Sequence, residues 1–170
     1  IRLSLVGSEM CIRDSYAGLR IHECFRMDTA AAERALRENA LTVKGKGGKV
    51  RTVPIEDERI LMMLRKLLAQ TERGHKLLVP DGMPTDRAIN ALELFIYRYR
   101  NGISDEGSDR RLTFHGLRHT YAAEKYTKLT EDSMSAIDAH YAVSRLLGHE
   151  RADVTNIYLA SVRKRGRDGE

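Results

Sequence analysis

The stretch TFHGLRHTYAAEKY, residues 113–126, decides how the rest of the chain is interpreted. Its pattern predicts a helix from about residue 114, and spacings of three and four residues put His115, Arg118 and His119 on one helical face. Three potential cations so close together repel one another unless a negative group lies among them. Either a phosphate or an acidic side chain of the same protein would supply that negative charge.

Composition sets wide limits. The chain has 170 residues, enough for one domain with a core of its own, and 29 basic against 24 acidic residues give a net charge of +5. This charge is compatible with a polyanionic partner but is a weak signal. Two cysteines form no CxxC pair, and no long apolar run or secretory signal is present, so we expect a cytoplasmic protein with no membrane contact. No acidic cluster or His/Cys set predicts a metal or other cofactor.

The first fifteen residues differ from the rest. IRLSLVGSEMCIRDS does not begin with Met, fits no element of secondary structure and resembles translated sequencing-adapter sequence. We expect residues 1–15 to be non-native, with a native first strand or helix as the alternative, and take 16–170 as the domain.

From residue 16 onward the pattern is regular. Helices are predicted at 17–27, 56–71 and 150–162 and from about residue 114. Two more are predicted to begin at caps, one at Asp28 or Thr29 and one at Thr85, and another is predicted to end at Gly148. Two β-rich runs within 41–55 flank a Gly/Lys turn and predict a hairpin, and 76–80 is predicted to be a short strand. The sum is an α+β fold, mostly helical with a small antiparallel sheet.

Residues suited to phosphate chemistry stand at separated places in this pattern. Arg20 starts a helix, Lys46 lies in the hairpin turn, His149 follows the helix stop, and Tyr158 lies nine residues further on. Each residue by itself has an ordinary explanation. Arg20 can be a surface cation, Lys46 a solvated turn residue with Lys44 or Lys49 as alternatives, His149 a cation at a helix end, and Tyr158 a core aromatic.

The order of the motifs is more specific than any one of them. GLR with Glu23 three residues after the Arg, GKGGKVRTVPI, HGLRH, LLGH and a Tyr nine residues later resemble the catalytic domain of the tyrosine recombinase (phage integrase) family. The resemblance covers about residues 16–160. It implies site-specific recombination or integration of double-stranded DNA without metal or ATP, through a 3′-phosphotyrosyl intermediate.

The resemblance assigns a role to six residues. Tyr158 would be the nucleophile, Arg20 and Arg118 would bind the non-bridging phosphate oxygens, and Lys46 would protonate the leaving 5′-oxygen. His115 would accept the phenol proton or bind the phosphate.

His149 would be a further phosphate donor. Two more residues are expected to support these six: His119 as a buttress, and Glu23 as an ion-pair partner of Arg20 or of a neighbouring His. Tyr121, Tyr126 and Tyr141 are expected to pack in the core or on the surface.

The chain also departs from the family pattern. We expect it to lack the N-terminal DNA-clamping domain, and the segment 127–140 appears as an inserted turn or short helix. The resemblance implies a tetramer on DNA during synapsis, with the free fragment monomeric. Two other functions stay open: a type IB topoisomerase, and a catalytically silent DNA-binding relic of an integrase.

Overall fold

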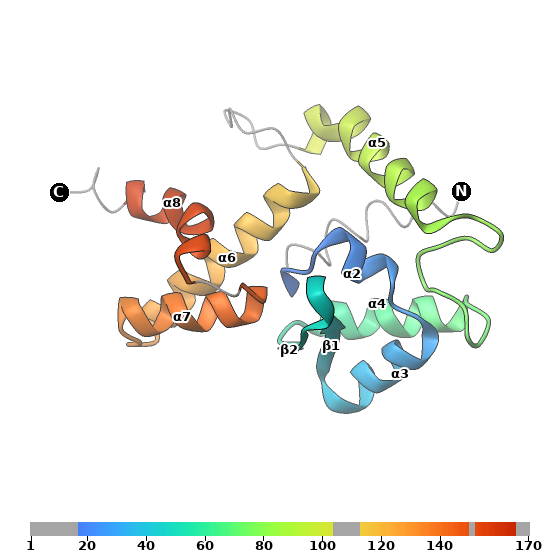
Figure 1. Ribbon diagram of the computed structural model, residues 1–170, viewed down its shortest axis with the longest axis horizontal. Helices are drawn as coiled ribbons and strands as arrows, with labels where there is room; N and C mark the ends of the chain where they lie inside the picture. The colour runs from blue at the N-terminus through green and yellow to red at the C-terminus, as the bar shows by residue number, and fades with distance from the viewer. Residues whose placement is uncertain (1–16, 104–112, 150–151, 166–170) are drawn as a thin grey trace.

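Two groups of helices make up the computed structural model, which describes residues 17–103, 113–149 and 152–165. The first group is α2 (Ile21–Phe25), α3 (Thr29–Glu38), α4 (Glu58–Ala69) and α5 (Thr85–Ile103), and with it lies the hairpin of β1 (Ala40–Lys44) and β2 (Val50–Pro54). The second group is α6 (Phe114–Glu131), α7 (Ala136–Leu147) and α8 (Thr155–Arg165). Figure 1 shows the two groups side by side, with the hairpin turned toward α7.

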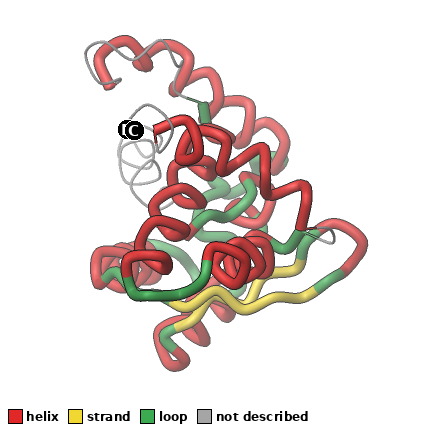
Figure 2. Tube along the Cα trace, turned by 90° about the vertical axis from the view of Figure 1, so that its left-hand side faces the viewer, coloured by secondary structure: helices red, strands yellow, loops and turns green. Residues whose placement is uncertain are grey.

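The sheet is the small antiparallel one that the sequence predicts. β1 and β2 pair from Ala40 opposite Pro54 to Lys44 opposite Val50, and the turn between them contains the short 3₁₀ helix η1 (Lys46–Gly48). Gly47 and Gly48 adopt positive φ angles of 74° and 83°, which glycine tolerates without a steric penalty. The two strands run next to each other beneath helices in Figure 2. The α+β class, mostly helical, is therefore confirmed.

Several predicted helix ends are also confirmed. The Asp28 side chain accepts a hydrogen bond from the Ala31 backbone N–H at 2.8 Å, which makes it the cap of α3. Gly148 ends α7 in the left-handed conformation, with φ of 66°. The prediction for Thr85 was wrong in detail. Thr85 is the first residue of α5, because the Pro84 carbonyl already accepts from the Ala88 N–H, and its hydroxyl accepts a hydrogen bond from Lys76 Nζ.

One prediction about a connecting segment was wrong. Residues 76–80 form no strand; Lys76 makes a single bridge with Asp28, and Leu77 and Leu78 turn into the core. A short apolar run without a partner strand is buried equally well as a loop. In the segment 127–140 the first residues complete α6, a turn follows, and the Ser135 hydroxyl caps α7 by accepting from the Asp138 N–H. That this segment is an insertion relative to the family stays a prediction.

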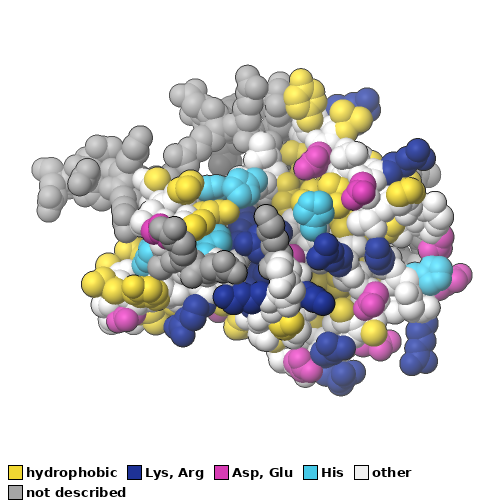
Figure 3. Space-filling model, viewed as in Figure 1, with side chains coloured by type: hydrophobic (Ala, Val, Ile, Leu, Met, Phe, Trp, Pro, Cys, Tyr) yellow, Lys and Arg dark blue, Asp and Glu magenta, His cyan; other side chains and the backbone are white. Residues whose placement is uncertain are grey.

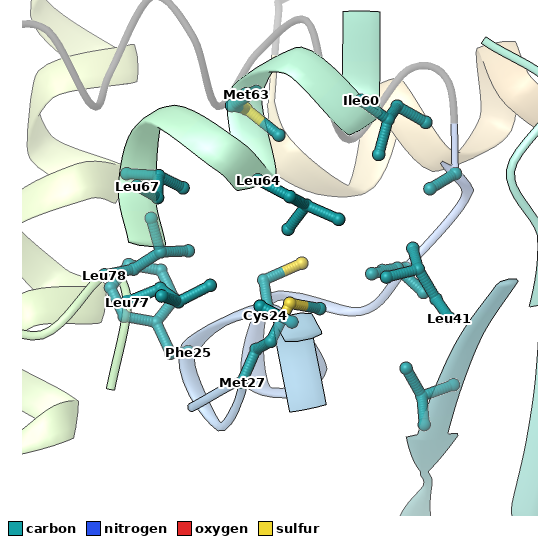
Figure 4. Packing of buried hydrophobic residues seen from close by; sticks show 14 of the residues in the cluster. Cys24, Phe25, Met27, Leu41, Ile60, Met63, Leu64, Leu67, Leu77 and Leu78 are labelled. Atoms are coloured by element: carbon teal, nitrogen blue, oxygen red, sulfur yellow. The ribbon is translucent and has the colours of Figure 1, made fainter. Parts of the chain in front are cut away.

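The main apolar core lies in the first group. α4 contributes Ile60, Met63, Leu64 and Leu67 at helical spacing, and these side chains pack on Cys24 and Phe25 of α2 (Figure 4). A smaller cluster joins α6, α7 and α8, and its buried residues are Tyr121, Ala122, Val143, Leu147, Tyr158 and Leu159. Tyr158, the predicted nucleophile, is thus part of the smaller cluster.

Candidate active site

Helix α6 supplies three of the predicted residues, but the structure places them in different environments. Thr113 starts the helix, since its hydroxyl accepts from the Gly116 N–H at 2.9 Å. His115 is exposed, His119 is half-buried, and Arg118 is buried. The helical spacing does bring them to one side, where all three face Tyr158 from α8.

Tyr158 lies among basic side chains. Its ring stacks on His119 with centroids 4.1 Å apart and an interplanar angle of 16°. The rings of His149 and His115 lie 4.9 and 5.5 Å from the Tyr158 ring, and the Arg118 guanidinium carbon lies 5.8 Å from the same centroid. Tyr158 is only 8% exposed. The structure therefore brings a phenol, three imidazoles and a guanidinium from α6, α7 and α8 into one cluster.

Arg118 joins the two helix groups. Its guanidinium donates to the Gly18 carbonyl, which precedes α2, and to the Leu147 carbonyl at 2.5 Å, while among the described residues its Nε atom has no hydrogen-bond partner. Burial, and then the charge of Arg20, lower the pKa of Arg118, whereas the hydrogen bond with Tyr158 raises it. An arginine remains charged under such conditions. Arg118 thus places a fixed positive charge beside the phenol.

His149 is neutral, not a cation at a helix end. Burial and the nearby Arg118 lower the pKa of His149 to about 4. Its Nε2 atom lies 3.4 Å from an Arg118 nitrogen, which can only donate, so Nε2 is the acceptor. The proton is then on Nδ1, which lies 2.8 Å from the Thr155 hydroxyl. Thr155 is fully buried and was not anticipated from the sequence, where nothing marks a threonine near a histidine as its partner.

His115 also favours the neutral form. Partial desolvation of the His115 ring lowers its pKa, and the charges of Arg118 and Arg20 lower it further. The three potential cations of the opening stretch are therefore not three charges at neutral pH. The arginines carry the positive charge, and their charges help to keep His115 and His149 neutral.

A buried carboxylate, Glu23, lies beside Arg20, and its hydrogen-bond partners are arginines outside the opening stretch. The Glu23 side chain lies 3.3 Å from Arg20 Nη1, as one of the expected pairings requires, and also accepts from the Arg20 backbone N–H at 2.7 Å. Its closest partner is Arg51, at 2.6 Å, which sequence reasoning missed. Burial by itself would raise the pKa of Glu23, but the hydrogen bonds from Arg51 and Arg20 outweigh burial and lower it.

One signal in the sequence could have identified Arg51. Arg51 and the fully buried Val53 are two residues apart in β2, so both side chains leave the same face of the strand. A charged residue on the inward face of a short strand indicates a buried partner of opposite charge.

The hairpin turn approaches this carboxylate. A Cβ atom at Gly45 would lie 3.4 Å from Arg20 Nη1 and 3.5 Å from Glu23 Oε1. Lys46 follows directly as the first residue of η1, so the backbone of the turn borders the cluster. Its side chain lies outside the part of the chain that the structure describes, and its predicted role remains a prediction. Figure 3 shows Lys and Arg side chains gathered beside histidines across the middle of this face.

Tyr121 and Tyr141 lie in environments that differ from that of Tyr158. Tyr121 is buried, its ring lies against Gly18, and burial raises its pKa to about 12. Tyr141 is exposed on α7. Within the residues that the structure describes, no three His, Cys, Asp or Glu side chains are grouped as a metal site requires. None of the described helices has the length and apolar character needed to cross a membrane.

Comparison with known proteins gives consistent matches. The model of the phage integrase family matches residues 15–165. The tyrosine recombinase XerD of Pseudomonas putida is 28% identical over 148 residues, which cover 83% of this chain and 45% of XerD. The chain therefore spans about half the length of this curated relative.

Solved structures show the same fold. The crystal structure of XerA recombinase superposes with a TM-score of 0.64 at 20% identity, over 99% of this chain and 62% of XerA. The Tn1549 transposon integrase, solved in complex with circular intermediate DNA, gives a TM-score of 0.59 at 17% identity, over 92% of this chain and 57% of that protein.

Proposed function

Because the chain belongs to the phage integrase family, we propose that it is the catalytic part of a tyrosine-type site-specific recombinase that cuts and rejoins double-stranded DNA. The observation that carries this proposal is the cluster around Tyr158, where a buried phenol lies among three imidazoles, two of them with lowered pKa values, and a charged arginine. A phenol is a weak nucleophile at neutral pH unless positive charge and a base are next to it. This cluster supplies both.

The proposed step exchanges one phosphodiester for another. The Tyr158 oxygen attacks a backbone phosphorus, the bond from phosphorus to the 5′-oxygen breaks, and a 3′-phosphotyrosyl bond forms. The phenol proton leaves to a base and the 5′-oxygen gains a proton, so charge and atoms balance. Attack by a 5′-hydroxyl of a second strand then reverses the step, so no nucleotide hydrolysis is needed.

His115 is the proposed acceptor of the phenol proton. Its ring lies 5.5 Å from that of Tyr158 and is exposed, and its lowered pKa keeps a nitrogen lone pair available at neutral pH. His119 stacks flat on the phenol ring, which fixes the direction of the hydroxyl and suits a buttress. Lys46 is the proposed donor to the leaving 5′-oxygen, by its place in the motif of the hairpin turn.

Arg20 and Arg118 are the proposed ligands of the non-bridging oxygens, where negative charge increases in the transition state. The Arg20 side chain is partly exposed and its guanidinium makes only long contacts, so the guanidinium is available to an external oxygen. Arg118 directs its donors at two carbonyls, and a phosphate oxygen would replace one of them.

His149 would become a donor only when the phosphate arrives. Its Nε2 atom is an acceptor beside Arg118 in the structure. A bound phosphate brings negative charge next to this ring, which raises the pKa of His149 and favours protonation. We propose that the transition from acceptor to donor accompanies DNA binding.

The test is the formation of a covalent adduct. The protein is mixed with supercoiled plasmid without metal or ATP, the reaction is quenched with detergent, and DNA-linked protein is measured for wild type, Tyr158→Phe and Tyr141→Phe. The matched control Tyr141→Phe removes a hydroxyl from an exposed tyrosine. Adduct in wild type and Tyr141→Phe but not in Tyr158→Phe is expected, and equal adduct in all three would refute the assignment.

The same reactions separate the other functions. Relaxed plasmid without recombinant product would indicate a type IB topoisomerase, and DNA binding without adduct a silent relic. We propose further that the complete protein acts in the cytoplasm and assembles as a tetramer on DNA, because exchange between two DNA sites needs four cleavage events. Sedimentation with and without DNA measures this assembly, and the free chain is expected to be monomeric.

A further inference from the structure

Arg51, which has no predicted role, makes three short polar contacts. Its two terminal nitrogens donate to the two oxygens of Glu23, Nη1 to Oε1 at 2.6 Å and Nη2 to Oε2 at 2.7 Å. Its Nε atom donates to the Leu146 carbonyl at 2.8 Å. The Arg51 side chain is only 10% exposed. A planar guanidinium that grips a carboxylate with both terminal nitrogens is held in one orientation.

The contacts of Glu23 distinguish Arg51, whose guanidinium is fixed, from Arg20, whose guanidinium is held less tightly. Each Glu23 oxygen receives a short hydrogen bond from Arg51. Arg20 shares one of these oxygens at the longer distance of 3.3 Å, and reaches the Gly148 carbonyl at 3.5 Å. The Arg20 side chain is 36% exposed, against 2% for Glu23. Arg51 thus holds the carboxylate, and the carboxylate in turn guides the more exposed Arg20.

The end of α7 gathers all three arginines. The last carbonyls of a helix have no partner within the helix and carry the negative end of its dipole. Leu146 accepts from Arg51, Leu147 from Arg118 and Gly148 from Arg20. Three guanidiniums from α2, β2 and α6 therefore converge on consecutive carbonyls, directly before His149. Together with Glu23, these carbonyls offset the mutual repulsion of the guanidiniums.

Glycine is needed where Arg51 passes α7. A Cβ atom at Gly148 would lie 2.9 Å from Arg51 Cδ, closer than such atoms approach, and Gly148 has a positive φ of 66°. The glycine of the LLGH motif therefore both ends α7 and leaves space for the Arg51 side chain. The motif before His149 and the Arg of KVRTVPI are thus fitted to each other.

We propose that Arg51 is a positioning residue for the cleavage site. Through Glu23 it sets the direction of Arg20, and through Leu146 it sets the place of the α7 end that carries His149. Arg51 acts through these groups and does not itself contact the phosphate, because its donors are already directed at Glu23 and Leu146. The inference rests on the proposed function for its effect on cleavage, but not for its effect on Glu23.

The first measurement therefore needs no DNA. The charged groups that face Glu23 are Arg20 from its own helix and Arg51 from β2. Titration of carbon-13-labelled glutamate carboxyls by NMR is expected to show a higher pKa for Glu23 in Arg51→Met than in wild type, because burial then opposes ionisation with only Arg20 to balance it. Arg51→Lys keeps the positive charge but loses the two parallel donors of the guanidinium, so the pKa of Glu23 is expected to lie between those in wild type and in Arg51→Met. An unchanged pKa in Arg51→Met would overturn the inference whatever the activity.

The second measurement is the rate of adduct formation on plasmid. Arg51→Met is expected to lower the rate by about 10- to 100-fold, the scale on which misplaced catalytic groups act, and Arg51→Lys is expected to restore part of it. The control is Arg59→Met, which removes an exposed arginine paired with Asp57 outside the cluster and should leave the rate unchanged. Full activity of Arg51→Met would refute the positioning role.

A double-mutant cycle separates positioning from general stability. If Arg51 acts through Glu23, then Arg51→Met in a Glu23→Gln background lowers the adduct rate much less than in wild type. If Arg51→Met lowered the adduct rate by the same factor in both backgrounds, the link through Glu23 would be overturned. Because Arg51→Met can lose stability, each rate is measured below the melting temperature of its own variant, and Arg51→Lys provides the same comparison with less disturbance. If wild type forms no adduct, the proposed function fails, while the Glu23 titration still decides the role of Arg51.

Discussion

The two helix groups bury different kinds of residues. Residues 17–103 bury most of a continuous apolar core, in which α4 packs on α3 and α5 packs on α2. Residues 113–165 bury a smaller cluster that contains Tyr158, and among the described residues Arg118, Ser144 and Thr155 are buried there as well. Burying polar groups contributes less to stability than burying apolar area, since each must be compensated by a hydrogen bond.

The difference shows how the site is fastened. The second group is attached to the first by Phe114, which belongs to the first group's apolar core, and by directed contacts, among them Arg118 to the Gly18 carbonyl, Arg51 to the Leu146 carbonyl, and Lys125 to Glu56. Such contacts define positions more sharply than apolar packing does, and they bring the proposed catalytic groups of the two sides together. Sites of this kind commonly reduce stability in exchange for activity. The comparison predicts that substitutions in the two groups affect activity and stability separately.

The largest effect on activity is expected for Arg118→Met. Loss of one donor to a developing oxyanion lowers rates by about 10²- to 10³-fold, and adduct formation should fall by this amount. Stability should fall by only about 1–2 kcal/mol, because the Gly18 and Leu147 carbonyls lose a donor but a buried charge is removed at the same time. Adduct assays and thermal unfolding measure the two effects. A large loss of stability with normal activity per folded molecule would show that Arg118 serves the fold and not the proposed active site.

The largest effect on stability is expected for Leu64→Ala. Leu64 is fully buried in the first group, and such truncations cost about 3 kcal/mol of unfolding free energy. Urea unfolding measures this loss. Adduct formation per folded molecule should stay near the wild-type level, because Leu64 contacts the core and not the cluster around Tyr158. An activity loss as large as that of Arg118→Met would show that the two groups are not separable.

A smaller effect is expected where the two groups meet at a glycine. Gly148→Ala adds both the strain of a positive φ and a close approach to Arg51, for a cost of about 2–3 kcal/mol. The matched control is Gly82→Ala, which has φ of 74° and no atom within 4 Å of the added Cβ, for a cost of about 1 kcal/mol. The difference between the two unfolding free energies measures the contact with Arg51. Equal costs would indicate that Arg51 moves aside freely.

The pH dependence of stability provides a finer test. An unfolded His has a pKa near 6.5, whereas the pKa of His149 in the folded chain is about 4. Between these values the unfolded state binds more protons, so stability is complete above about pH 6.5 and decreases as the pH falls toward 4. The decrease due to His149 should be roughly 1 kcal/mol, allowing for solvent screening, and it should disappear in His149→Gln.

The control for this test has the opposite sign. The hydrogen bond with Asp81 raises the pKa of the exposed His75, so its contribution is present at low pH and is lost as the pH rises. Melting temperatures from pH 4 to pH 8 compare His75→Gln, His149→Gln and wild type. A dependence that His149→Gln leaves unchanged would show that His149 is not held neutral.

The smallest effect is expected for Glu56→Gln. Glu56 pairs with Lys125 and, at 3.3 Å, with Lys128, and these lysines lie on α6. The hydrogen bond from Lys125 lowers the pKa of Glu56, but the carboxylate is 50% exposed. The expected loss of unfolding free energy is below about 1 kcal/mol and should decrease with added salt. A larger or salt-independent loss would make this pair a main attachment between the groups.

Local signals predicted most of the fold. The hairpin, the stripe of α4, the Asp28 cap and the Gly148 stop each depend on residues close in the sequence, and each is confirmed. The failures share one cause. Residues 76–80 have the composition of a strand, and Thr85 is a residue type that often caps helices. A strand also needs a partner strand, and a cap needs a backbone N–H that has no other acceptor. A short stretch of sequence shows neither of these conditions.

By itself the sequence determined which residues could carry the chemistry. The order of Arg20, Arg118, His149 and Tyr158 along the chain indicates the family, and helical spacing places His115 and Arg118 on one side. Their proposed roles remain to be tested. Only the tertiary structure decided the electrostatic state of this cluster, because pKa shifts and buried ion pairs depend on distances between segments far apart in sequence. It made His149 neutral beside Arg118, and it paired Glu23 with Arg51 across 28 positions of the chain.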